Sequence, residues 1–192
     1  MIKEHKERII LGIDPGTAVL GYGLVQEKGS ALSLLSLGVV RLDHISDHGL
    51  KLQKIFQKTA ALIEEYKPDC MALEAPFYGK NIQVMLKLGR VQGVAMAAAL
   101  EREIPIFEYA PRKVKQSVTG NGNASKEQVA AMLKTLLKFD ETPHFLDATD
   151  GLAVAVCHAF QGKIGGATGG KSFSGWEAFV KDKGNSGRIK GI

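Results

Sequence analysis

Three strand-length apolar segments in immediate succession constrain the fold of this chain more than any other feature of its sequence. They are the runs RIILGID, AVLGYGLVQEKGS and ALSLLSLGVVRL within residues 8–42, with turn-forming residues at Asp14-Pro15-Gly16 and Lys28-Gly29-Ser30. Short apolar runs bounded by Gly, Pro and Asp are typical of β-strands joined by tight turns. The sequence therefore predicts that the chain begins with a three-stranded antiparallel meander.

The following part of the chain alternates between helical and strand-like patterns. Apolar residues at helical spacing predict helices over 49–66, 81–102, 124–139 and 144–160. Strands are predicted within 69–79 and 104–111, and residues 112–124 are expected to form a loop that carries Gly and Lys. Strands followed by alternating helices and strands predict an α/β fold with a mixed five-stranded sheet flanked by helices.

Two of these helices carry additional signals. Ser125 and Gln128 form a capping box at the start of the 124–139 helix. The 81–102 helix is apolar on more than one face, so it is either a core helix between two layers or a helix that also contacts a second subunit. Lys87, Arg90 and Gln92 interrupt it too often for a membrane span.

The composition indicates one globular domain, expected over residues 1–161, followed by a basic tail. The chain has 192 residues, of which 45% are hydrophobic and 23% charged, as in ordinary globular proteins. Residues 162–192 hold nine glycines, six basic and two acidic residues, which leaves 19 basic against 18 acidic residues for the domain. We expect a flexible tail. A nearly neutral domain does not indicate nucleic-acid binding by its bulk charge.

The chain start and the cysteines favour a cytoplasmic protein. Residues 1–8 mix both charge signs, and the apolar run behind them is short, so we expect neither a signal peptide nor a membrane span. Cys70 and Cys157 each lie in an apolar run, which is typical of buried free thiols in a reducing compartment.

Four carboxylates lie where an apolar element would favour none. Asp14 and Glu74 end two predicted strands, and Asp147 and Asp150 lie three residues apart in the last helix. Each has a structural explanation as well: Asp14 favours the turn, Glu74 marks the strand reaching solvent, and the pair caps a helix start. Thr142-Pro143 is the better helix start, however, and would leave two repelling acids on one helix face.

Repulsion between neighbouring acids is relieved if they share a cation. Carboxylates from two strand ends and one helix face can form a pocket of oxygen ligands, which suits Mg²⁺ or Mn²⁺. Two such ions can activate water for attack on a phosphodiester and stabilise the leaving oxygen. Phosphoryl chemistry is therefore the leading hypothesis.

Five motifs, in order along residues 8–160, resemble those of the RuvC family of bacterial Holliday junction endonucleases. They are LGIDPGTAVLGYGLV, DCMALEAPFYGKN, MLKLGRVQGVA, IPIFEYAPRKVKQSVTGNGNASKEQV and LDATDGLAVAVCHA. The resemblance implies a ribonuclease-H-like fold whose four acids are Asp14, Glu74, Asp147 and Asp150, with two Mg²⁺ ions per site or Mn²⁺ in their place. It also implies a homodimer that nicks two strands of like polarity at a four-way DNA junction and leaves 5′-phosphates. RuvA and RuvB are the partners it implies.

The resemblance extends to residues that would contact DNA. Lys115 and Lys126 match family lysines near the scissile phosphate, and Arg112 and Lys113 lie in the same segment, which contains no acid. Phe77 matches a family aromatic that contacts an unstacked base. The alternatives are solvated surface lysines and a core phenylalanine.

Three further residues have two interpretations. Gly89 and Gly93, four residues apart, permit close helix packing, which the resemblance places at the dimer interface and which could equally occur within one subunit. His144, three residues before Asp147, either handles protons or is a surface histidine.

Two other functions compete with the nuclease. GIDPGT also resembles the first phosphate loop of actin-like ATPases and sugar kinases, but this chain lacks room for their second lobe and has no second Asp-Gly-Thr turn. The other alternative is a junction-binding scaffold that has lost its nuclease activity, against which the intact set of four acids argues.

Overall fold

Within residues 7–76, 81–140 and 145–164, which the computed structural model describes, five strands form one mixed sheet. They are β1 (Glu7–Asp14), β2 (Val19–Lys28), β3 (Ala31–Arg41), β4 (Cys70–Glu74) and β5 (Ile106–Tyr109). The order in the sheet is β3-β2-β1-β4-β5. β1, β2 and β3 pair antiparallel, whereas β1 with β4 and β4 with β5 pair parallel. The predicted meander and the mixed sheet are confirmed.

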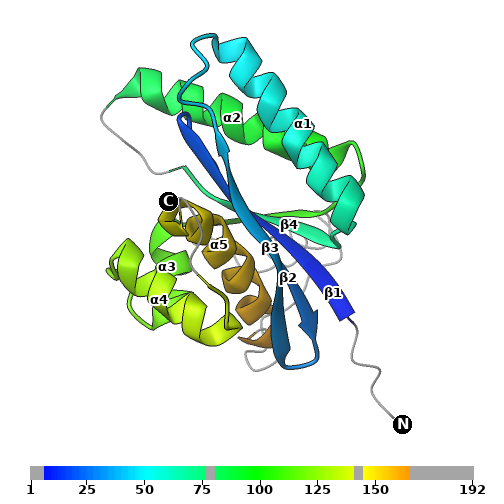
Figure 1. Ribbon diagram of the computed structural model, residues 1–192, viewed down its shortest axis with the longest axis vertical. Coiled ribbons are helices and arrows are strands. Elements are labelled where there is room, and N and C mark those ends of the chain that lie inside the picture. Colours follow the sequence, from blue (N-terminus) through cyan, green and yellow to red (C-terminus); the bar gives the residue numbers. More distant parts are fainter. Residues whose placement is uncertain (1–6, 77–80, 141–144, 165–192) are drawn as a thin grey trace, which may run out of the picture. The chain divides into compact units, whose positions relative to one another are not determined.

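Five helices in the same residues cover both faces of this sheet. They are α1 (His48–Tyr66), α2 (Ile82–Leu100), α3 (Pro111–Thr119), α4 (Lys126–Leu137) and α5 (Phe145–Ile164). α1 and α2 lie on one side of the sheet, and α3, α4 and α5 lie on the other (Figure 1). No helix of the described residues is long and apolar enough to cross a membrane.

The strands supply side chains to two cores because successive residues point to opposite faces. Leu11, Ile13 and Met71 belong to the core beneath α1 and α2. Ile10 and Ala72 belong to the core that α5 completes on the other face. Each face of the sheet is therefore buried by its own layer of helices.

The prediction of a loop over 112–124 was wrong, because residues Pro111–Thr119 form helix α3. Pro111 takes the first helical position, where its missing N–H costs nothing. Val114 and Val118 are buried on one side, and Gly120 ends the helix with φ 77°. With two apolar residues in nine, the segment had too weak a pattern to be identified as a helix from sequence.

The other helices begin and end near their predicted limits, and the capping box of Ser125 and Gln128 is confirmed. α5 continues to Ile164, past the expected domain limit at 161. The expected helix start at Thr142-Pro143 and residues 165–192 lie outside the described residues, so the flexible tail stays a prediction. Cys70 and Cys157 are buried free thiols, as expected.

Four glycines bring the main chain of α5 into direct contact with the sheet. Gly12 of β1 and Gly23 of β2 are paired neighbours, Gly21 pairs with Asp14, and Gly151 lies on α5. A Cβ atom on Gly12 would lie 2.3 Å from the Gly151 carbonyl oxygen, and one on Gly21 would lie 2.1 Å from the Asp147 carbonyl oxygen. Real Cβ atoms do not approach backbone this closely. We call Gly12, Gly21, Gly23 and Gly151 the glycine seam.

The glycine seam predicts that Gly23→Ala separates β2 from α5. Its Cβ would lie 2.4 Å from Leu152 Cα, which only a shift of the helix can relieve. We expect a loss of about 2 to 3 kcal/mol in the free energy of unfolding, measured in urea. Gly49→Ala is the control, because its Cβ would approach only Asp47 Oδ1 at 3.1 Å. A Gly23→Ala variant as stable as the control would contradict the seam.

Candidate active site

Asp14 and Glu74 are the last residues of two neighbouring parallel strands. β1 and β4 pair with Ile13 opposite Leu73, so the two acids follow at the same edge of the sheet. Ile10, Gly12 and Asp14 are every second residue of β1, and Cys70, Ala72 and Glu74 are every second residue of β4. Side chains at every second position share a face, and Ile10, Cys70 and Ala72 belong to the core that α5 completes. Both acids therefore point toward the α5 side.

α5 supplies Asp147 and Asp150, three residues apart on one helix face. Asp147 lies in the first turn, where the helix dipole stabilises a carboxylate. Its carbonyl oxygen lies over Gly21, and Gly21 pairs with Asp14. The glycine seam thus places the first turn of α5 beside the end of β1.

The pKa values indicate that the acids share one site. Burial, together with the charges of Asp150 and Asp147, raises the pKa of Asp14 to about 7. Burial likewise raises the pKa of Glu74 to about 8, with contributions from the charges of Asp14 and Asp150. Burial also raises the pKa of Asp150. The acids of β1, β4 and α5 therefore act on one another electrostatically, and Asp14, Glu74 and Asp150 do so in largely buried positions.

Lys126 supplies the opposing charge. It is the first residue of α4, directly after the Ser125 cap, and its ammonium forms an ion pair with Asp150 and lies 3.9 Å from Asp147 Oδ1. Burial lowers the pKa of Lys126, but the hydrogen bond and the charge of Asp150 outweigh this and raise it. The Asp150 side chain is 17% exposed against 45% for Asp147, so the lysine pairs with the more buried acid.

In this arrangement no three acidic, histidine or cysteine side chains of the described residues lie close enough together to hold a metal ion. The Lys126 ammonium already contacts both acids of α5. The donor set is nevertheless the one that hard cations select, since it contains only carboxylates. A divalent cation would also relieve the repulsion that raises the pKa of Asp14 and Glu74. The chemistry of the residues therefore fits such an ion.

The other residues that the sequence predicts to act in the site differ in whether they reach the four acids. The charge of Lys115 lowers the pKa of Glu74 and of Asp150, so Lys115 faces the acids. The side chain of Arg112 packs against Gly122 instead, and among the described contacts neither it nor Lys113 reaches the four acids. Phe77 and His144 lie outside the described residues.

Gly89 and Gly93 lie on an exposed face of α2. A Cβ atom built on either glycine would meet no atom within 4 Å. The alternative that these glycines permit close packing within one subunit is therefore wrong for the described part of the chain.

The sequence analysis missed one wall of the site. A cleft of about 270 Å³ opens beside Asp14 and Glu74, and its lining continues through Pro15, Ala75, Pro76, Val84, Met85, Leu88 and Gln92. The α2 residues follow helical spacing, which the sequence contains, but in the sequence Gln92 looks only like a polar interruption of an apolar helix. Which elements its side chain faces is decided by the fold.

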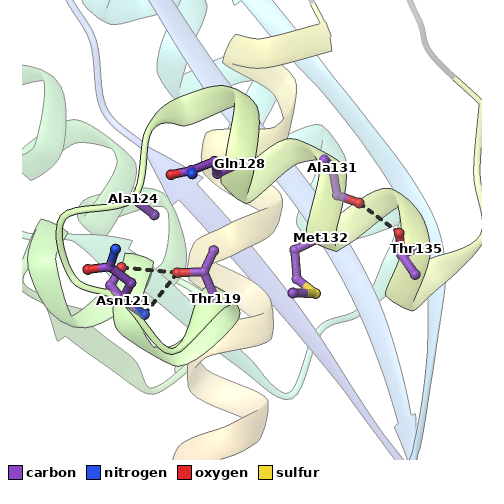
Figure 2. Close-up of a pocket in the computed structure, with 7 residues that line it drawn as sticks. All are labelled: Thr119, Asn121, Ala124, Gln128, Ala131, Met132 and Thr135. Carbon is purple, nitrogen blue, oxygen red and sulfur yellow. Dashed lines mark hydrogen bonds between the residues drawn. The ribbon is translucent and has the colours of Figure 1, made fainter.

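A larger pocket of about 590 Å³ lies between α3 and α4, away from the acids. Its lining is Thr119, Asn121, Ala124, Gln128, Ala131, Met132 and Thr135 (Figure 2). The Thr119 hydroxyl donates to the Asn121 carbonyl oxygen at 3.0 Å, and the Thr135 hydroxyl donates to that of Ala131 at 3.0 Å. The Thr119 bond holds the turn between α3 and α4, whereas the Thr135 bond lies within α4, and the lining of the pocket contains no acid.

Comparison with known proteins decides the family. The model of the family "Crossover junction endodeoxyribonuclease RuvC" matches residues 10–158. The chain is 58% identical over 187 residues to the RuvC of Cytophaga hutchinsonii, covering 97% of this chain and 90% of that protein. It is 52% identical over 192 residues to the RuvC of Bacteroides fragilis, covering 99% and 100%. The chain belongs to the RuvC family.

Solved structures agree with this assignment. Thermus thermophilus RuvC in complex with a Holliday junction substrate is 32% identical, with a TM-score of 0.76 over 82% of this chain and 96% of that one. The yeast mitochondrial Holliday junction resolvase, 16% identical with a TM-score of 0.58, shares the fold. The predicted ribonuclease-H-like fold is confirmed. Membership of the RuvC family makes the actin-like ATPase interpretation wrong.

The raised pKa values predict how this RuvC-family protein responds to pH without metal. Its folded state holds protons on Asp14 and Glu74 that the unfolded chain releases near pH 4, so stability declines as the pH rises toward 8. Glu74→Gln removes one of these charges. In EDTA at pH 8.5 we expect it to exceed the wild type by about 1 to 3 kcal/mol, and at pH 4.5 to equal it.

Urea unfolding at both pH values measures this difference. Glu65→Gln, at an exposed position of α1, is the matched control and should change stability equally at both pH values. The same pH dependence in Glu74→Gln and in the control would contradict a shared acidic site.

Proposed function

We propose that this RuvC-family protein is a divalent-metal-dependent endonuclease that resolves four-way DNA junctions by paired, symmetric phosphodiester hydrolysis and leaves 5′-phosphates. The observation that carries the proposal is the convergence of Asp14, Glu74, Asp147 and Asp150 from β1, β4 and α5, where burial and the charges of neighbouring acids raise the pKa of Asp14 and of Glu74. Its relatives are named as crossover junction endodeoxyribonucleases, which points to the same substrate.

The four acids would hold two Mg²⁺ ions per site, with Mn²⁺ as the alternative. Bound metal supplies an activated water and stabilises the leaving oxygen of the phosphodiester. The contribution of this chain is to bring the four carboxylates to one end of the sheet, with Asp14 and Glu74 largely removed from water before any cation arrives. Since the pKa values of Asp14 and Glu74 are raised to about 7 and 8, cation binding must displace protons from them.

Lys115 and Lys126 would bind the phosphate that is cut. Both lysines already act electrostatically on the acids. If the Lys126 ammonium left Asp150, it would be free to bind a phosphate that approaches the acids. Arg112 and Lys113 on α3 would extend this basic surface to neighbouring phosphates. Phe77 keeps its proposed role at an unstacked base.

A second copy of this chain would cover the exposed face of α2. Ile82 is 72% exposed, Leu86 53% and Leu100 61%, and Gly89 and Gly93 continue the same stripe. Steps of four, three and four residues from Ile82 to Gly93 follow the spacing of a coiled-coil seam. The two glycines would let the partner helix approach closely. A two-fold dimer would present two sites to a two-fold junction, which accounts for paired cuts.

The cellular context is proposed from the family alone. We expect the branch-migration proteins RuvA and RuvB to act on the same junctions, and a cytoplasmic location. The two buried free thiols agree with a reducing compartment.

The decisive test is a labelled four-way junction incubated with the protein and Mg²⁺. We expect paired nicks in the wild type, and a loss of at least about 1000-fold in Asp14→Asn or Asp150→Asn, because several kcal/mol of transition-state stabilisation come from bound metal. Junction affinity should stay within a few-fold, since metal ligation serves chemistry more than docking. Glu108→Gln on β5 is the control, because Glu108 is exposed and pairs with Leu73, so its side chain points to the opposite face of the sheet from Glu74. Junction binding without nicks in Mg²⁺ or Mn²⁺ would instead support a scaffold.

The dimer has its own test. Gly93→Glu places a charge on the exposed stripe of α2, so we expect monomers in sedimentation at concentrations where the wild type is dimeric. Such monomers should lose the coupling between the two nicks. Gln53→Glu adds the same charge on exposed α1 and should remain dimeric. A wild type that is monomeric at micromolar concentration would refute this surface.

A further inference from the structure

The cleft beside Asp14 and Glu74 has two chemically different walls. One wall holds the two carboxylates, and the other is a face of α2. Val84, Leu88 and Gln92 follow one another at steps of four residues, so their side chains point to the same side of this helix. The first two are apolar, and the third is a carboxamide.

Gln92 is a largely buried residue whose amide faces the cleft. Only 6% of the residue is exposed, and its side chain has no hydrogen-bond partner among the described residues. A carboxamide offers two N–H donors and an acceptor oxygen with two lone pairs. Its amide atoms are not among the fully buried, unpaired side-chain atoms of the described residues, so they reach the solvent of the cleft. Because Gln92 lines the cleft, a molecule that enters there can supply these partners.

The size and lining of the cleft limit what can enter. Its volume of about 270 Å³ lies below the range of about 300 to 1,000 Å³ typical of sites for drug-sized ligands, so it suits one nucleotide rather than a base pair. The apolar face of Val84 and Leu88 offers a surface for a base or sugar. The acids at the opposite wall are those that would act on the phosphate. A base next to the cut phosphate would therefore enter unstacked, between the acids and Gln92.

We propose that this cleft is the subsite for the nucleotide beside the scissile phosphate, and that Gln92 determines sequence specificity by hydrogen bonding to the edge of its base. This inference rests on the proposed junction nuclease function. A carboxamide can bond two groups of one base at once, as glutamine does with adenine, and such a pair discriminates against a wrong base by about 1 to 3 kcal/mol.

The experiment compares nicking rates on a set of four-way junctions that differ only in the base pairs at the crossover. The wild type should cut some of them much faster than others. In Gln92→Leu, which keeps the bulk of the side chain and removes its hydrogen bonds, the ratio between preferred and disfavoured junctions should fall about 5- to 150-fold. The Mg²⁺ concentration for half-maximal rate should stay unchanged.

Two further variants separate specificity from folding. Gln83→Leu makes the same change on exposed surface at the opposite side of α2, and it should keep the wild-type preference. Gln92→Asn keeps the carboxamide but shortens its reach, so it should also lose preference. Thermal unfolding of Gln92→Leu should stay close to that of the wild type, because the amide makes no hydrogen bond within the described residues that the change could break. If Gln92 had only a structural role, Gln92→Leu would unfold at a lower temperature and would keep the wild-type preference among junctions.

Each other outcome identifies what fails. A wild type that nicks no junction overturns the proposed function and the subsite with it. A wild type that nicks junctions while Gln92→Leu and Gln92→Asn keep its preference overturns the subsite alone, as does a wild type indifferent to the bases. A change in Mg²⁺ dependence with unchanged preference would mean that the amide acts on the metal site, which also overturns the inference.

Discussion

Direct contact between the main chain of α5 and the glycines of β1 and β2 is the constraint on which the rest of the structure depends. A helix normally stands off a sheet by the thickness of its side chains. Here Gly12, Gly21 and Gly23 remove that layer, and Gly151 removes it from the helix. The first turn of α5 consequently lies over the end of β1, within the electrostatic reach of Asp14. A site built from both elements requires this close approach.

The acidic site works against the stability of the fold that holds it. Burial and mutual repulsion raise the pKa of Asp14 and Glu74, so their ionised forms destabilise the metal-free protein. The ion pair between Lys126 and Asp150 offsets part of this charge. The same lysine is proposed to bind the phosphate, so it has competing partners. Loading of the site with cations and engagement of DNA are expected to be coupled through this side chain.

Helix α2 has three faces with different surroundings, which explains why it is apolar on more than one face. Val91, Ala95 and Ala99 are buried against the sheet and α1. The stripe from Ile82 to Gly93 is exposed and is proposed to meet a second subunit. The face of Leu88 and Gln92 lines the cleft. Of the two sequence-based alternatives for this helix, core packing describes the face of Val91, Ala95 and Ala99, and subunit contact stays a prediction for the exposed stripe.

The sequence by itself determined the strands, most of the helices and the positions of the four acids at the ends of apolar elements. These features follow from local periodicity, caps and turns, each of which depends on residues that are close together in the chain. Only the tertiary structure decided that α3 is a helix, that Lys126 pairs with Asp150, and that Gln92 faces the acids. A periodic pattern shows that a helix or strand has a face, but the meeting of two faces depends on packing between residues far apart in the chain. The glycine seam shows this limit, because its glycines look like ordinary strand interruptions until α5 lies on them.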